Sequence, residues 1–260
     1  MYSYNLFQWI LMFYIYCFLG WCVESTIVSV KQKRFINRGF LKGPFLPIYG
    51  TGTILILFVS LPLIDYPLLV YIAGLISTTI LEYFTGWLME TIFKIKYWDY
   101  SNDKFNYKGR ICLVSSLFWG ILTLFVIYVI HSPISNFVTH LGNTTTIVLS
   151  VVSSTLFIAD IIYSTYNVLD LNRILKFRTK IKNDIESLNT QITEKNSSND
   201  LSLSNKQLSS LKFEYDKYND KVNFFHKHII KSYPSASSKN FNEEFKGLKE
   251  RIESTFKKNK

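Results

Sequence analysis

Carboxylic acids interrupt three apolar stretches of this 260-residue chain. Glu24, Glu82 and Asp160 each lie within a stretch long enough to cross a bilayer, and Glu90 lies at the end of the stretch that holds Glu82. An ionisable side chain at the centre of a bilayer costs about 2.5–3.5 kcal/mol on insertion scales, so such residues usually have a function. Grouped carboxylates also repel one another unless cations neutralise them. The chemistry they could perform is recognition of a polar ligand, ion or proton, or acid–base catalysis.

Two arginines are the obvious cations for these acids. Arg38 lies in the segment 37–52, whose glycines and prolines interrupt the start of an apolar stretch and leave backbone groups unpaired at membrane depth. Transporters use such broken backbone to bind ions and substrates. Arg110 follows a segment in which Asp99 and Asn106 lie among aromatic residues, a composition that suits an interfacial cap at the mouth of a cavity.

The sequence therefore predicts a polar pocket for a ligand or an ion. Its predicted members are Glu24, Arg38, Glu82, Glu90, Asp99, Asn106, Arg110 and Asp160. Two alternatives stay open: a catalytic centre, or plain ion pairs (Glu24 with Arg38, Glu82 with Arg110) that only set helix register. No catalytic residue, metal site or cofactor is predicted. The chain shows no nucleophile–base pair, and its four histidines lack ligand spacing with Cys, Asp or Glu.

Five apolar stretches must position these residues. They are 5–30, 48–64, 68–90, 113–131 and 146–168. A helix needs roughly 20 mostly apolar residues to cross a hydrocarbon core about 30 Å thick. Backbone groups in lipid must bond internally, so each stretch is predicted to form a helix. We therefore expect an all-α, polytopic membrane protein with about five transmembrane helices.

The distribution of Lys and Arg predicts how these helices are oriented. Both residue types occur between the first and second stretches, between the third and fourth, and after the fifth. The alternate segments, 1–4, 65–67 and 132–145, contain neither. Basic segments tend to stay in the cytoplasm, so the amino terminus is predicted to be outside and residues 171–260 to be cytoplasmic.

With this orientation, three carboxylates fall at one depth in the inner half of the membrane. Glu24 lies six residues from the cytoplasmic end of its stretch, and Glu82 and Asp160 lie eight residues from theirs. At about 1.5 Å per residue, these separations are roughly 9 Å and 12 Å. Gly20 and Gly86 lie one turn from Glu24 and Glu82, which lets neighbouring helices pack closely beside the acids.

Charge divides the chain into two parts. Residues 1–170 contain 18 charged side chains, against 30 in the 90 residues of 171–260, and the second part carries +8 of the net charge of +10. The first part is therefore suited to lipid and the second to water. This division excludes a soluble globular enzyme, a disulfide-stapled secreted module and a wholly disordered chain.

The tail, residues 171–260, is predicted to be helical. Apolar residues over 208–229 repeat at alternating spacings of three and four, a shorter seam covers 181–192, and polar residues 196–200 separate the two. An antiparallel hairpin or coiled coil would bury both seams, and a third amphipathic helix is expected over 241–256. Three uses of the tail stay open: an intramolecular hairpin, a homodimer, or a docking surface for another protein. Nucleic acid is not an expected partner, because the lysines are mixed with acids and no base-reading motif is present.

Several motifs occur in the order seen in a known bacterial family. They are Gly20-Trp21-x-x-Glu24, the block from Asn37-Arg38-Gly39 to Gly52, Glu82-Tyr83-x-Thr85-Gly86-x-x-x-Glu90, Trp98-Asp99-Tyr100-Ser101, Phe105-Asn106-x-x-Gly109-Arg110-Ile111-Cys112 and Trp119-Gly120. In these motifs the chain resembles the membrane-protein family named Putative ABC-transporter type IV, or CmpB-like. The resemblance implies a permease-like subunit in the bacterial plasma membrane.

A permease of this kind needs a source of energy. The chain has no Gly-x-x-x-x-Gly-Lys-Ser/Thr loop, so it is not expected to hydrolyse ATP by itself. The energy for transport would come from a separate ATPase subunit or from an ion gradient. The leading hypothesis is a transport-type membrane protein with an inward-opening pocket for a small polar or lipid-headgroup ligand. The alternatives are an intramembrane enzyme that acts on a lipid, and a non-transporting scaffold that acts through its tail.

Overall fold

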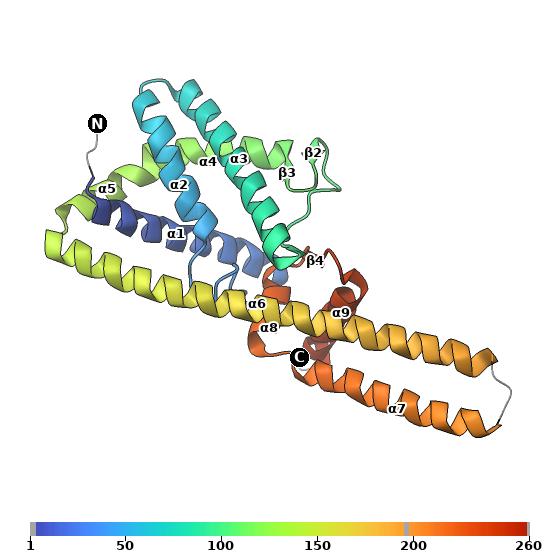
Figure 1. The fold of residues 1–260 in the computed structure, drawn as a ribbon. Helices are drawn as coiled ribbons and strands as arrows, with labels where there is room; N and C mark the ends of the chain where they lie inside the picture. Colours follow the sequence, from blue (N-terminus) through green and yellow to red (C-terminus); the bar gives the residue numbers. More distant parts are fainter. Residues whose placement is uncertain (1–3, 195–197, 259–260) are drawn as a thin grey trace.

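The structure of the protein, a computed structural model, describes residues 4–194 and 198–258. It is 78% helical with almost no sheet, which confirms the all-α fold class. Four helices are long and apolar enough to cross a membrane (Figure 1). They are Leu6–Gln32, Pro67–Phe93, Leu113–His140 and Asn143–Ile192.

The first two helices form a closely packed pair. Helix α1 (Leu6–Gln32) begins at Asn5, whose side chain accepts a hydrogen bond from the backbone N–H of Gln8. The Gln8 side chain accepts one in return from the backbone N–H of Asn5, a reciprocal cap that explains why the helix begins here. Helix α2 (Pro47–Ser60) packs so closely against α1 that a Cβ atom at Gly20 would collide with the ring of Tyr49. A residue without a side chain is therefore required at this contact.

The second predicted transmembrane stretch is the shortest in the structure. Helix α2 continues as the 3₁₀ turn η1 (Leu61–Leu63), and together they form an apolar helix of 17 residues, Pro47–Leu63. At about 1.5 Å per residue, such a helix is roughly 25 Å long. Helix α3 (Pro67–Phe93) follows after a short turn, and a proline fits its first position because the missing N–H has no partner there.

The fourth and fifth predicted stretches extend beyond their expected ends. Helix α4 (Leu113–Phe125), the π-helical segment η2 (Val126–Ile130) and α5 (His131–His140) form one continuous apolar helix. Helix α6 (Asn143–Glu194) runs for 52 residues and passes through the predicted junction at residue 170 without a break. Since residues 143–194 contain neither Gly nor Pro, nothing in the backbone ends the helix where the composition changes.

The tail forms a hairpin and then folds back. Helix α7 (Ser198–Asp220) runs antiparallel to the distal half of α6 (Figure 1), where the rings of Phe177 and Tyr218 stack with centroids 5.4 Å apart. The seam predicted over 208–229 is divided between two helices. Asn223 caps the new helix α8 (Phe224–Ser232) by accepting a hydrogen bond from the backbone N–H of His226, so the chain turns here.

Two short strand pairs tie loops together. Strand β2 (Asn106–Tyr107) pairs with β3 (Ile111–Cys112) in the loop before α4. Strand β1 (Ile95–Lys96), which follows α3, pairs antiparallel with β4 (Ser237–Ser238) of the tail. The last helix, α9 (Asn242–Lys258), matches the third amphipathic helix that the sequence predicts.

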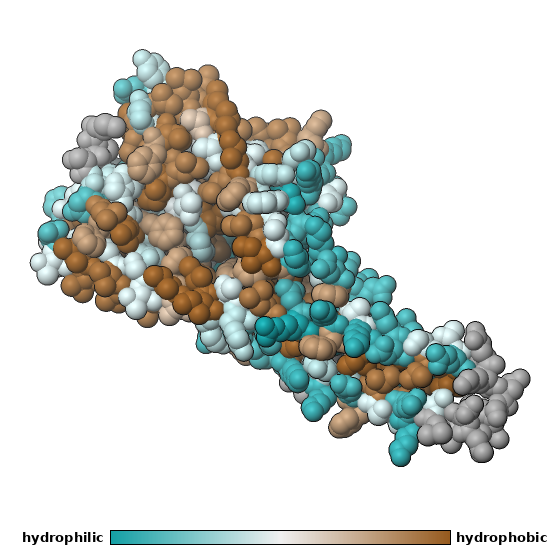
Figure 2. All heavy atoms as spheres, viewed as in Figure 1, coloured by the Kyte–Doolittle hydropathy of each residue, from teal (hydrophilic) through white to brown (hydrophobic). Residues whose placement is uncertain are grey.

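The tail shares a hydrophobic core with the base of the helical bundle. Its buried members come from α3, β1, α6, α8, α9 and the segments that connect them: Phe93, Ile95, Tyr97, Val168, Leu171, Leu175, Val222, Phe225, Ile229, Ile230, Tyr233, Ala236, Phe245, Leu248 and Ile252. This core joins residues from both sides of position 170. Figure 2 shows apolar surface over the bundle and hydrophilic surface over the loops and tail, as fits a membrane protein.

Candidate functional site

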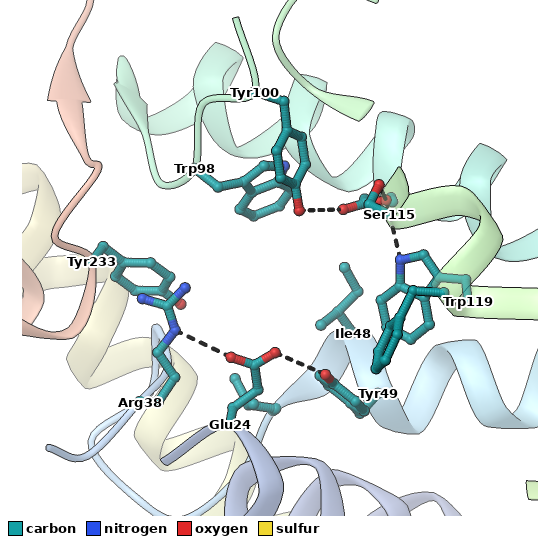
Figure 3. Close-up of a pocket in the computed structure, with 12 residues that line it drawn as sticks. Glu24, Arg38, Ile48, Tyr49, Trp98, Tyr100, Ser115, Trp119 and Tyr233 are labelled. Atoms are coloured by element: carbon teal, nitrogen blue, oxygen red, sulfur yellow. Dashed lines mark hydrogen bonds and ion pairs between the residues drawn. The ribbon is translucent and has the colours of Figure 1, made fainter. Parts of the chain in front are cut away.

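A cavity of about 180 Å³ lies at the end of the bundle that contacts the tail. Its charged lining residues are Glu24 on α1, Arg38 in the loop after α1, and Glu82 on α3. Its aromatic lining residues are Tyr49, Trp98, Tyr100, Phe118, Trp119 and Tyr233. In Figure 3, side chains from helices, loops and the tail surround one central space. A site with few charges and many rings recognises both charge and shape.

Glu24 has two partners at the cavity wall. The Tyr49 hydroxyl donates a hydrogen bond of 2.8 Å to its Oε1 atom, and Nε of Arg38 lies 3.6 Å from its Oε2 atom. The contact between α1 and α2 at Gly20 places the ring of Tyr49 one turn from Glu24. The predicted ion pair between Glu24 and Arg38 is present in the structure.

Arg38 links the cavity to the tail. Its backbone N–H donates a hydrogen bond to Oγ of Ser25 on α1, at 3.0 Å. Its Nη1 group donates to the carbonyl oxygen of Ser232, and its guanidinium carbon lies 4.4 Å from the centre of the Tyr233 ring. The Ser232 hydroxyl donates in turn to the carbonyl oxygen of Asn37, at 2.5 Å. These contacts make the end of α8 a wall of the cavity.

Glu82 is held by neutral donors. Its carboxylate accepts hydrogen bonds of 3.1 Å each from the Tyr100 hydroxyl, the Ser115 hydroxyl and Nε1 of Trp119. The residue is only 5% exposed. Among residues 4–194 and 198–258, no Lys, Arg or His forms an ion pair with it. The pair of Glu82 with Arg110, which the alternative of plain ion pairs includes, is therefore not formed in this part of the chain.

Arg110 instead pairs with Glu90, outside the cavity. Its Nη2 and Nε groups lie 2.7 Å and 3.0 Å from Oε2 of Glu90, and its Nη1 group donates to the Tyr83 hydroxyl at 3.2 Å. Lys239 of the tail approaches the other Glu90 oxygen at 3.4 Å. Burial lowers the pKa of Arg110, but the Glu90 carboxylate outweighs this and raises it above its ordinary value. Two cations thus neutralise Glu90.

The other predicted site residues order loops. Asp99 accepts hydrogen bonds from the backbone N–H and the hydroxyl of Ser101, at 3.0 Å and 2.5 Å. The side-chain Oδ1 atom of Asn106 accepts one from the backbone N–H of Gly109, whose positive φ of 67° favours glycine. Asp160 accepts bonds from the backbone N–H groups of Lys42 and Gly43, at 3.1 Å and 2.7 Å. Asp160 therefore attaches the loop after α1 to α6 and does not line the cavity.

Two phenols at the cavity stay neutral at cellular pH. Burial, and then the charge of Glu82, raises the pKa of Tyr100. Burial also raises the pKa of Tyr233 to about 12, although the guanidinium of Arg38 opposes the shift. Tyr100 therefore keeps the proton that it donates to Glu82, and Tyr233 presents an uncharged ring to Arg38.

The family comparison agrees with this architecture. The sequence profile of the family described as Putative ABC-transporter type IV matches residues 11–165, more than half of the chain. The chain belongs to the ABC-transporter type IV family. The family name suggests an ABC-transporter-type membrane protein, which the apolar helices fit. No curated protein and no solved structure matches the chain.

The matched region contains nearly the whole cavity. Of the residues that line it, only Tyr233 lies outside residues 11–165. In this member of the ABC-transporter type IV family, the tail therefore adds one wall to a cavity that the matched helices and loops form.

Sequence reasoning did not assign Tyr49, Tyr100 or Tyr233 to the site. Tyr49 and Tyr100 lie within the motifs that carry the family resemblance, but ring residues near membrane ends are usually interfacial anchors. Tyr233 appears in the sequence only as the end of a helix before Pro234. No local pattern in the sequence relates it to the loop that holds Arg38.

Proposed function

We propose that this protein is a permease-like subunit whose cavity binds a small polar or lipid-headgroup ligand during transport. One observation carries the proposal: Glu82 is a buried carboxylate at a cavity wall that neutral donors hold and no described cation neutralises. A buried charge without a counter-charge is costly, so a plain structural role would favour a partner such as Glu90 has. A ligand group can supply the missing interaction.

The cavity opens toward the cytoplasm in this proposal. The loop after α1, the loop before α4 and the tail all contribute to its walls, and these are the Lys- and Arg-rich parts of the chain. Basic segments tend to stay in the cytoplasm, which supports an outside amino terminus and a cytoplasmic tail in a bacterial plasma membrane. A separate ATPase subunit would supply the energy, in keeping with the family name.

The tail is proposed to act within one chain. The apolar seam that could have paired two copies is partly covered by the contact between α6 and α7, as the stacking of Phe177 on Tyr218 illustrates. This contact favours the intramolecular hairpin over the homodimer. A second contact favours transport over the scaffold alternative. The tail contributes directly to the cavity wall through Tyr233 and through the bond of Ser232 with Arg38.

The first prediction tests the role of Glu82. Replacing Glu82→Gln keeps the shape and removes the charge, so we expect insertion and abundance to be unchanged and activity to be lost. The measurement is rescue of growth in a strain deleted for the gene, together with the amount of protein in the membrane. Asp65→Asn is the matched control, since it removes a carboxylate from the turn between α2 and α3, and Glu82 lies 15 residues, or roughly 22 Å, beyond the start of α3. Full rescue by Glu82→Gln would show that the cavity is not the functional site. Conversion of labelled membrane lipids by the purified protein would instead support the enzyme alternative.

A further inference from the structure

We propose that the ligand of this cavity carries a substituted ammonium group. The inference rests on the proposed function, in that it assumes the cavity to be a ligand site, and it goes further by naming the chemistry of the ligand. It differs from the simplest expectation, in which the arginines would hold an anionic group. The charges and the rings of the cavity wall argue for a cation instead.

Among the residues that the structure describes, Arg38 is the only cation that lines the cavity, and it already has partners. Arg38 contacts Glu24 at 3.6 Å, donates to the carbonyl oxygen of Ser232 and lies over the ring of Tyr233. Glu24 and Arg38 therefore neutralise each other, and the charge of Glu82 remains. An anionic ligand would be repelled by Glu82, and a neutral one would leave its charge uncompensated. A cation supplies the missing counter-charge.

The aromatic side chains of the cavity wall also favour a cation. The hydroxyl of Tyr100 and the Nε1 group of Trp119 both donate to Glu82, and the Tyr49 hydroxyl donates to Glu24. The polar edges of these rings are thus occupied. What remains for a ligand is ring surface beside a carboxylate, and the negative faces of Trp and Tyr attract ammonium groups within about 6 Å. Quaternary ammonium groups are commonly recognised by such aromatic cages.

The arrangement of the rings suits a compact cation. Tyr49 on α2 and Trp119 on α4 lie with ring centroids 5.4 Å apart and planes inclined by 54°. The side chains of Trp98, Tyr100 and Tyr233 line the other sides of the cavity (Figure 3). A cavity of about 180 Å³ has space for a head group of several heavy atoms, because one water needs roughly 10–15 Å³ by this measure. It is too small for the acyl chains of a lipid.

Two sources could supply such a group. A free amine could enter from the cytoplasm, or a lipid could insert only its ammonium head group. Phe118 lines the cavity and is also 58% exposed on α4, so the rim of the cavity reaches an apolar outer face of the bundle. Both sources share the same recognition chemistry, and the experiment separates them.

The test measures binding to the purified full-length protein in nanodiscs of phosphatidylglycerol, a lipid without an ammonium group. Choline and ethanolamine are titrated while tryptophan fluorescence and thermal unfolding are recorded, because Trp98 and Trp119 line the cavity. The neutral isostere 3,3-dimethyl-1-butanol and the anion glycerol phosphate are titrated in parallel. We expect saturable binding of an ammonium compound, and at least about tenfold weaker binding of the isostere.

Variants and lipids complete the design. Glu82→Gln should weaken ammonium binding by about tenfold or more, whereas Asp65→Asn should leave it unchanged. If the protein responds to phosphatidylethanolamine in the nanodisc but not to free amines, the source is a lipid head group. Binding of the free amines in phosphatidylglycerol alone identifies a small soluble cation. Both results support the proposal.

The proposal is overturned if neither free nor lipid-borne ammonium groups bind better than the neutral isostere, or if glycerol phosphate binds best. That failure is distinct from failure of the proposed function. Loss of growth rescue by Glu82→Gln without ammonium binding would leave the cavity as the functional site with another ligand. Full rescue by Glu82→Gln would reject the functional site itself, whatever the binding data.

Discussion

Glu82 and Glu90 lie eight residues apart on α3 in opposite chemical surroundings. Glu90 is neutralised by Arg110 and Lys239, whereas Glu82 receives only neutral donors. Eight residues at 3.6 per turn rotate the second acid by about 80° around the helix, so the two side chains face different neighbours. Glu90 therefore holds loops in place, and the proposed ligand contact falls to Glu82.

Histidines in the tail make its packing sensitive to pH. Burial lowers the pKa of His226, although the carbonyl oxygen of Asn167 and the carboxylate of Asp170 on α6 oppose the shift. Burial also lowers the pKa of His228, and the charge of Lys231 lowers it further. Hydrogen bonds with the backbone of Leu41 and Gly39, and the charge of Asp160, oppose this shift. Both rings therefore bind protons less readily in the folded tail than in the unfolded chain.

The second prediction is loss of tail stability in mild acid. Because the folded pKa lies below the unfolded value of about 6.5, the stabilisation is complete above that pH and is lost as pH falls through the folded pKa. We expect the tail of the purified protein to become sensitive to protease as pH is lowered from 7.5 to 5. His226→Gln should flatten this dependence, and His140→Gln on α5 is the control. An unchanged profile in His226→Gln would show that His226 does not govern it.

At the scale of the elements, α6 is a continuous helix that connects the bundle with the tail. It lies beside α1 at its amino-terminal end, where the Ser150 hydroxyl donates to the carbonyl oxygen of Phe7 at 2.8 Å. Farther along, Arg178 pairs with Glu244 of α9 at 3.0 Å and donates to the Tyr215 hydroxyl of α7 at 2.6 Å. Continuity of this one helix therefore places the tail against the cavity.

The third prediction tests that continuity at Lys176, whose side chain is exposed on α6. Lys176→Pro removes one backbone hydrogen bond and clashes with the preceding turn, which costs about 3 kcal/mol or more. We expect the tail to become protease-sensitive while the protein still inserts, and growth rescue to fall. Lys176→Ala at the same position should behave as the parent. Equal protease resistance of the two variants would mean that loop contacts alone hold the tail.

At the scale of the whole molecule, the tail and the bundle form one unit around the cavity. The strand pair β1–β4, the contacts of Arg38 with Ser232 and Tyr233, and the shared hydrophobic core all cross between them. Deleting the tail would remove a cavity wall together with part of that core, so loss of activity on deletion would not separate a scaffold from a transporter. Point changes at the contacts are more informative.

The fourth prediction is that the tail can be cross-linked to the loop after α3. Lys96 and Ser237 are paired residues in the β1–β4 ladder, and the Cβ atoms of such pairs lie about 4.5–5.5 Å apart. The double variant Lys96→Cys, Ser237→Cys should form a disulfide under mild oxidation in isolated membranes, seen as a shift on a non-reducing gel. The two single variants are the controls. A double variant that stays reduced would show that the tail lies elsewhere in the membrane-bound protein.

The sequence by itself determined where helices form, and which part of the chain suits lipid and which suits water. Apolar stretches of spanning length, capping residues such as Asn5, and prolines at Pro47 and Pro67 are local signals, so α1, α2 and α3 could be predicted closely. The absence of Gly and Pro over 143–194 also signals the length of α6, although the change in composition near residue 170 suggested a boundary there. The pair of Glu24 with Arg38 was predictable because Arg38 lies in the loop that follows the helix of Glu24.

Only the tertiary structure decided which groups share the cavity. Depth along a helix can be counted from the sequence, but the direction in which a side chain points depends on how helices rotate and pack against one another. Glu82 and Asp160 therefore separate, although their predicted depths are the same. Tyr233 also lines the cavity, although it lies nearly two hundred residues beyond Arg38 in the sequence. It is brought there because α8 and α9 fold onto the bundle and bury apolar surface. No local pattern in the sequence relates these helices to the loop that holds Arg38.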